Sequence, residues 1–113
     1  MKPRRHHSPH AVLRAVCRAS GVSLSDLVFG VRLPRTVRAR QAAVYLLRHH
    51  TLLSFPEIAE EIGRGKTGRR SHSTQVDRYW AADRLVKWGN VEFINLLDAA
   101  CEALGEVKET ADD

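Results

Sequence analysis

The stretch that most strongly determines the fold runs from residue 54 to residue 87 and reads SFPEIAEEIGRGKTGRRSHSTQVDRYWAADRLVK. Its first four residues, Ser54-Phe55-Pro56-Glu57, form a capping box with proline in the first helical turn, where the missing N–H costs nothing. The short helix that they start ends near Ile62, because Gly63 follows it. A capped short helix, a connector and a longer helix together are the pattern of a helix-turn-helix.

The longer helix of this pair opens with small polar residues. Either Ser71 or Ser73 can cap it, and it reaches about Lys87. Its apolar residues, among them Tyr79 and Trp80, are available for packing. Because a recognition helix reads base edges with its first turn, short polar side chains there allow close approach to the major groove.

Periodic apolar residues predict further helices on both sides of this pair, and no stretch alternates with period two. The predicted fold class is therefore all-α, a compact domain of about six helices that contains the helix-turn-helix. We expect residues 30–36 to form a loop, because Pro34 cannot continue a helix. The further helices are predicted at residues 10–20, 24–29, 37–50 and 91–104. The expected organisation is a flexible basic arm at 1–9, the domain at 10–105 and an acidic, frayed tail at 106–113.

The charges of the chain are strongly segregated. Its 113 residues carry a net charge of +5, with 14 Arg against 4 Lys. Residues 1–88 hold 17 basic and 6 acidic groups, whereas residues 89–113 hold 1 basic and 7 acidic groups. Because arginine suits phosphate and base-edge recognition better than lysine, a basic block of this composition indicates a nucleic-acid partner.

Other functions fit the residues poorly. The G-K-T at 65–67 is no P-loop, since the first glycine of that motif falls at Glu60 inside a predicted helix, so we expect no nucleotide. The histidine pairs at 6–7 and 49–50 are adjacent rather than one helical turn apart, so we expect no metal. The hydroxyls beside His72 come with no sign of an oxyanion hole or a pocket in this short chain, so we expect no enzyme activity and no other cofactor. No apolar run spans a membrane, and the distant Cys17 and Cys101 suit a reduced, cytoplasmic protein.

Four short motifs give the chain a likeness to a known family. They are S-D-L-V (25–28), R-x-x-R-x-V-R-A-R-Q-A-A-x-Y-L (32–46), L-S-F-P-E-I (53–58) and R-S-H-S-T (70–74). In this order and spacing they resemble the C-terminal DNA-binding domain of DnaA, the bacterial replication initiator. The likeness covers about residues 10–86. It implies a helical domain that binds duplex DNA through a helix-turn-helix and a basic loop.

The resemblance also implies which residues contact DNA. In the family an arginine of the basic loop enters the minor groove, and Arg32 matches it, with Arg35 close enough to replace it. The family's recognition helix opens with R-D-H-[ST]-T, whose Asp, His and Thr positions read bases. The implied base contacts are Arg32, Ser71, His72, Ser73 and Thr74. The implied backbone contacts are Arg35, Arg38, Arg40 and Gln41. Independently of the resemblance, the positive charge of the connector predicts backbone contacts by Arg64, Lys66, Arg69 and Arg70.

Two departures put the family's target sequence in question. Ser71 replaces the family's aspartate, which removes an acceptor for a cytosine amino group. The connector before Arg70 is also about five residues longer than the family's usual glycine-glycine turn, and the added residues are basic. Duplex DNA therefore stays the expected partner, but a preference for the DnaA box does not follow.

The sequence supports two hypotheses of function. The first is a stand-alone, sequence-specific duplex DNA-binding protein without an ATPase module, which controls transcription or replication initiation from a bacterial, phage or mobile-element genome and associates with the nucleoid. The second is an interaction adapter that docks a partner, or a second copy, through residues 89–104. For those residues the alternative is a last helix that covers the core.

Overall fold

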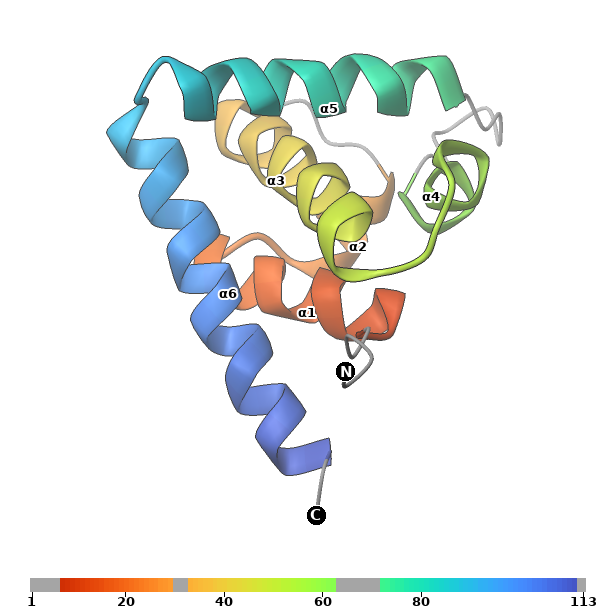
Figure 1. Cartoon of the computed structure of the whole chain (residues 1–113), viewed down its shortest axis with the longest axis vertical. Helices are drawn as coiled ribbons and strands as arrows, with labels where there is room; N and C mark the ends of the chain where they lie inside the picture. The colour runs from red at the N-terminus through yellow and green to blue at the C-terminus, as the bar shows by residue number, and fades with distance from the viewer. Residues whose placement is uncertain (1–6, 30–32, 63–71, 112–113) are drawn as a thin grey trace, which may run out of the picture.

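A computed structural model of the chain describes residues 7–29, 33–62 and 72–111, and Figure 1 shows their arrangement. Every regular element in these ranges is an α-helix, which confirms the all-α prediction and the number of helices. The helices are α1 (Pro9–Ser20), α2 (Leu24–Phe29), α3 (Pro34–His50), α4 (Phe55–Ile62), α5 (His72–Lys87) and α6 (Val91–Ala111).

Local signals explain how α1 begins and ends. The Ser8 hydroxyl accepts a hydrogen bond from the Ala11 N–H at 3.1 Å, and proline stands in the first helical turn. Gly21 ends the helix with φ +76°, a left-handed conformation that favours glycine, and its N–H donates to the Cys17 carbonyl. Ahead of α1, the His7 N–H donates to the His50 carbonyl at 2.9 Å, so this residue is tied to the end of α3.

Helix α3 begins three residues earlier than its predicted start at Val37. Leu33 has extended backbone angles and Pro34 is the first helical residue, so the prediction of a loop through residue 36 is wrong. The physical reason is that proline breaks a helix from the interior but suits the first turn, where no N–H bond is lost. The earlier start places Arg35 and Thr36 on the helix.

Helix α6 packs along α1 and completes the core (Figure 1). Its buried side chains, Phe93, Leu97, Ala100 and Leu104, meet Val12 and Val16 of α1 in one cluster with α3 and α4 residues. The described residues therefore support the core role for the apolar face of α6. The helix continues to Ala111, seven residues beyond its predicted end at Leu104.

Helices α4 and α5 form the predicted pair, and α5 runs along one edge of the molecule above α3 and α4 (Figure 1). Because α5 begins at His72, Ser73 lies inside its first turn and the prediction that Ser73 caps the helix is wrong. The other predicted cap, Ser71, lies outside the described residues. Trp80 also departs from its predicted packing role, since 52% of it is exposed.

Candidate nucleic-acid interface

The capping box that starts α4 forms as predicted. The Ser54 N–H donates to Glu57 Oε1 at 2.9 Å, and the Glu57 N–H donates to Ser54 Oγ at 3.4 Å. The Ser54 hydroxyl also donates to Glu57 Oε1 at 2.9 Å. The bonds from the Ser54 N–H and from its hydroxyl stabilise the carboxylate and lower the pKa of Glu57 below its ordinary value of 4.5. The box fixes the point at which the chain enters the helix-turn-helix.

An aromatic cluster holds α5 against α3 and α4. The Tyr79 ring stacks on Tyr45 of α3 with centroids 5.4 Å apart, and it meets Phe55 of α4 edge-on at 5.8 Å. The Tyr79 hydroxyl lies 3.3 Å from His49 Nε2. Burial, as the main cause, raises the pKa of Tyr45. Because Tyr79 touches both neighbouring helices, this cluster sets the direction in which α5 presents its first turn.

The first turn of α5 carries the predicted base contacts. His72 and Ser73 are helical, although their side chains lie outside the described part of the chain, and Thr74 is exposed. Arg32 and Ser71 lie outside the described residues altogether. The next residue after Thr74, Gln75, is buried, and its side-chain oxygen accepts a hydrogen bond from Arg78. The structure thus places the described part of this group at the exposed beginning of the recognition helix.

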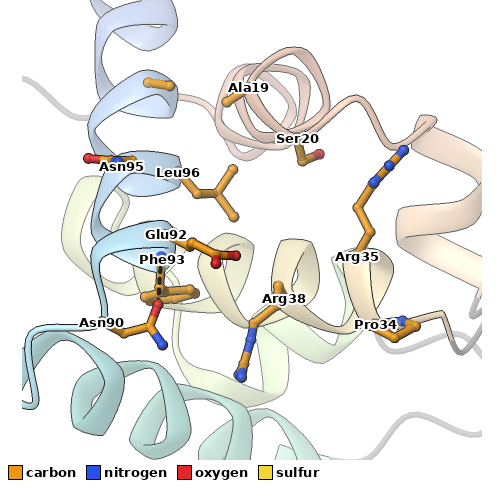
Figure 2. A pocket seen from close by; sticks show the side chains of 11 residues that line it. Ala19, Ser20, Pro34, Arg35, Arg38, Asn90, Glu92, Phe93, Asn95 and Leu96 are labelled. Atoms are coloured by element: carbon orange, nitrogen blue, oxygen red, sulfur yellow. Dashed lines mark hydrogen bonds between the residues drawn. The ribbon is translucent and has the colours of Figure 1, made fainter.

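Two of the predicted backbone contacts of α3, Arg35 and Arg38, line an open cavity. Arg35 and Arg38 are exposed near the start of α3, and Arg38 Nη1 donates to Gln41 Oε1 at 2.9 Å. They border a cavity of about 730 Å³ whose other walls are the end of α1 and the start of α6 (Figure 2). Glu92 and Leu96 of α6 line the same cavity as the two arginines (Figure 2). Arg35 and Arg38 are therefore accessible to a phosphate.

Arg40 does not join them, and the prediction that it contacts the DNA backbone is corrected. It is only 4% exposed, although it lies two residues from Arg38. Its Nε donates to the Leu27 carbonyl at 2.8 Å and its Nη2 donates to the Asp26 carbonyl at 2.7 Å. These carbonyls belong to α2, so Arg40 ties α2 to α3. A buried guanidinium cannot reach a phosphate from this position.

The remaining predicted contacts, Arg64, Lys66, Arg69 and Arg70, lie outside the described residues. One further cation, Arg48, was not selected from the sequence. It is exposed at the end of α3, donates to the Leu53 carbonyl at 3.0 Å and places its guanidinium 4.5 Å from the centroid of Phe55 at the start of α4. Its position a few residues before the capping box is the signal that points to it, because helix starts commonly contact phosphate.

The described residues offer neither a metal site nor a membrane-spanning helix. Among them, no group of three or more His, Cys, Asp or Glu residues is placed to hold a metal ion. No described helix is long and apolar enough to cross a membrane.

The comparisons with known proteins agree with this geometry. Residues 9–77, more than half of the chain, match the family described as the bacterial dnaA protein helix-turn-helix. A 56-residue stretch, 50% of the chain, is 45% identical to the chromosomal replication initiator protein DnaA of Rippkaea orientalis and covers 12% of that protein. The DnaA of Gloeothece citriformis is 36% identical over 80 residues, which are 71% of the chain and 17% of that protein.

A third relative, the DnaA of Thermomicrobium roseum, is 42% identical over 67 residues, which are 59% of the chain and 13% of that protein. The chain thus spans only a small part of the length of these relatives. Helix α6 lies entirely outside the residues that match the family. The match does include α1 to α4 and the first turns of α5, where the predicted contacts lie. The chain therefore belongs to the bacterial DnaA helix-turn-helix family.

Proposed function

We propose that this protein binds duplex DNA sequence-specifically through the first turn of α5 and through the residues that lead into α3. The observation that carries the proposal is the α4–α5 pair, whose second helix exposes Thr74 in its first turn and whose neighbour α3 exposes Arg35 and Arg38. Family membership supports it, since the matched family is a helix-turn-helix family. The concentration of basic groups in residues 1–88 supports it as well.

In this proposal the two parts of the surface have different tasks. The first turn of α5 enters the major groove, where His72, Ser73 and Thr74 meet base edges, joined by Ser71 ahead of the helix. Arg32 reaches the adjacent minor groove. Arg35, Arg38, Gln41 and Arg48, with the connector cations Arg64, Lys66, Arg69 and Arg70, hold phosphates and fix the register without reading sequence.

The biological role that we propose is control of transcription or of replication initiation by occupation of DNA sites. The matched relatives are named as chromosomal replication initiators, which favours a role connected with replication. A phage or mobile-element origin belongs to the same proposal. The adapter hypothesis is less supported, because the apolar face of α6 is packed into the core.

Selection of bound sites from random duplex DNA tests the proposal. We expect one short enriched motif, and a monomer would select a single non-palindromic site. The salt dependence of binding then distinguishes phosphate contacts from base contacts. Neutralising Lys66 and Arg69 together should weaken binding to all duplexes alike and reduce the slope of log affinity against log salt by about 2. Absence of any enriched motif, with the domain folded, would contradict sequence-specific recognition.

A further inference from the structure

Two tryptophans lie on the outer side of α5, where they have no role in the core. Trp80 is 52% exposed and Trp88 is 78% exposed, and Val91 at the start of α6 is 68% exposed beside them in sequence. The inner side of α5 is formed by other residues, including Gln75 and Ala82, which are buried. Exposed large apolar side chains grouped on one helix face mark a surface that binds something.

This surface is a straight stripe with charges on its midline. Asp77 and Arg84 are seven residues apart, so at 3.6 residues per turn they lie nearly in line along the helix. Trp80 and Trp88 fall within about 60° of that line. The Trp88 N–H donates to the Arg84 carbonyl at 2.8 Å, so the helical path continues to this tryptophan. We call Asp77, Trp80, Arg84 and Trp88 the outer stripe.

The described part of the chain leaves the outer stripe uncovered. Helix α5 forms one edge of the molecule, and in Figure 1 no other described helix lies beyond it. Asp77, Arg84 and Trp88 are exposed, and within the described residues neither Asp77 nor Arg84 forms an ion pair. The neighbouring Lys87 differs, because its Nζ lies 2.9 Å from Asp83 of the same helix. The stripe thus offers one carboxylate, one guanidinium and two indoles.

The composition of the stripe favours a protein over single-stranded nucleic acid. A groove for single strands combines aromatic side chains with an excess of positive charge, whereas here one acid balances one base. Tryptophan and arginine are also the residue types that dominate the energetics of protein interfaces. The two charges also restrict the kind of protein partner, because Asp77 and Arg84 make the stripe complementary to the same stripe on a second copy.

We propose that the outer stripe is the contact surface of a two-fold symmetric dimer of this protein. When two copies of α5 pair antiparallel about a point between Trp80 and Ala81, Asp77 of each copy faces Arg84 of the other. The two Trp80 side chains meet at the centre, where apolar burial is greatest. Both charge pairs form at once, because a two-fold axis repeats every contact.

The same pairing places Trp88 of one copy near position 73 of the other. The dimer therefore covers the first turn of α5, which, on the proposed function, is the part that reads DNA. This consequence rests on the proposed function. Because the dimer covers the residues that would read DNA, the dimer and the DNA complex exclude each other. The dimer is then a storage form that releases monomers when specific sites are available. The dimer itself stands independently of this consequence.

Sedimentation equilibrium of the full 113-residue chain and of charge-reversed variants tests the dimer. We expect a reversible monomer–dimer equilibrium for the parent chain. Asp77→Arg and Arg84→Asp should each weaken association at least about tenfold, because each places like charges opposite one another twice. The double variant Asp77→Arg/Arg84→Asp should restore association to near the parental level. Asp98→Arg, on the exposed face of α6, is the matched control and should change association little.

Three outcomes would overturn the dimer. The parent chain could remain monomeric up to about 1 mM, the weak limit of useful association. The double variant could associate as poorly as the single variants while circular dichroism shows that all are folded. Oligo(dT) could quench the tryptophan fluorescence of the parent, with binding lost in Trp80→Ala and Trp88→Ala, which would assign the stripe to single-stranded nucleic acid.

Competition between dimerisation and duplex binding is measured separately, so that failure of the dimer proposal can be distinguished from failure of the proposed function. Adding a selected duplex site should dissociate the dimer, whereas a duplex of scrambled sequence should do so only at higher concentration. A parent chain that dimerises but binds no duplex would contradict the proposed function and leave the dimer intact. A dimer that binds the duplex without dissociating would contradict the antiparallel register.

Discussion

Helices α5 and α6 both contain large apolar and charged residues, but α6 buries its large apolar side chains while α5 exposes two of them. Helix α6 buries Phe93 and Leu104 against α1, whereas its acidic residues Glu92, Asp98 and Glu102 are exposed. Helix α5 turns Trp80 and Trp88 outward and fixes itself to α3 and α4 mainly through Tyr79. Helix α6 therefore stabilises the domain, whereas the outer side of α5 is available for binding. The difference also separates residues that determine stability from residues that determine binding.

A substitution in the buried face of α6 should lower the free energy of unfolding far more than a substitution on the outer side of α5. Phe93→Ala removes a fully packed aromatic side chain from α6 and should lower the free energy of unfolding by about 3–5 kcal/mol. Trp80→Ala on α5 removes a larger side chain that is half exposed and should cost no more than about 1 kcal/mol. Urea denaturation of both variants checks this. Similar losses for the two substitutions would contradict the division between support and surface.

A smaller effect distinguishes two arginines of α3. Arg40→Ala removes two charge-assisted hydrogen bonds, one to the Leu27 carbonyl and one to the Asp26 carbonyl, so it should cost about 2–3 kcal/mol of stability. Arg38→Ala, its matched control two residues away, should leave stability nearly unchanged and weaken DNA binding instead. Thermal unfolding and a mobility-shift titration of each variant give the two readouts. An Arg40→Ala protein of parental stability would place its guanidinium outside the core.

The smallest effect concerns the start of α4. Hydrogen bonds from Ser54 lower the pKa of Glu57 in the folded protein, so the ionised carboxylate stabilises the fold. That contribution is present above the unfolded pKa, near 4.5, and is lost as pH falls through the folded value. Glu57→Gln should therefore show a flatter loss of stability below about pH 5 than the parent chain. Parallel pH profiles for the two proteins would contradict this assignment.

The sequence predicts most of the fold because its signals are local. The capping box at Ser54 and the stop at Gly21 are read directly from residue types, and both form as expected. Pro34 was misinterpreted, because its effect depends on whether it stands inside a helix or at its start. Arg40 could not be recognised as buried, because the carbonyls that hold it come from α2, thirteen and fourteen residues earlier. Tertiary packing decides such cases.

The candidate site is predictable to a similar extent. The order of motifs identifies the family and the first turn of α5, whereas the exposure of Trp80 depends on which side of α5 meets α3. Periodicity alone does not choose that side, since the apolar residues of α5 are spread around the helix. For Arg48 the sequence offers only its place before the capping box, whereas its contact with Phe55 in the next helix depends on tertiary packing.

The most direct test of the central claim is a mobility-shift titration of His72→Ala on a duplex site selected with the parent chain. If the first turn of α5 reads bases, this variant should lose about 1–3 kcal/mol of specific binding and keep its affinity for unrelated duplex DNA. Asp98→Asn, on the exposed face of α6, serves as the control and should bind like the parent. A folded His72→Ala protein that binds the selected site with parental affinity would contradict the account.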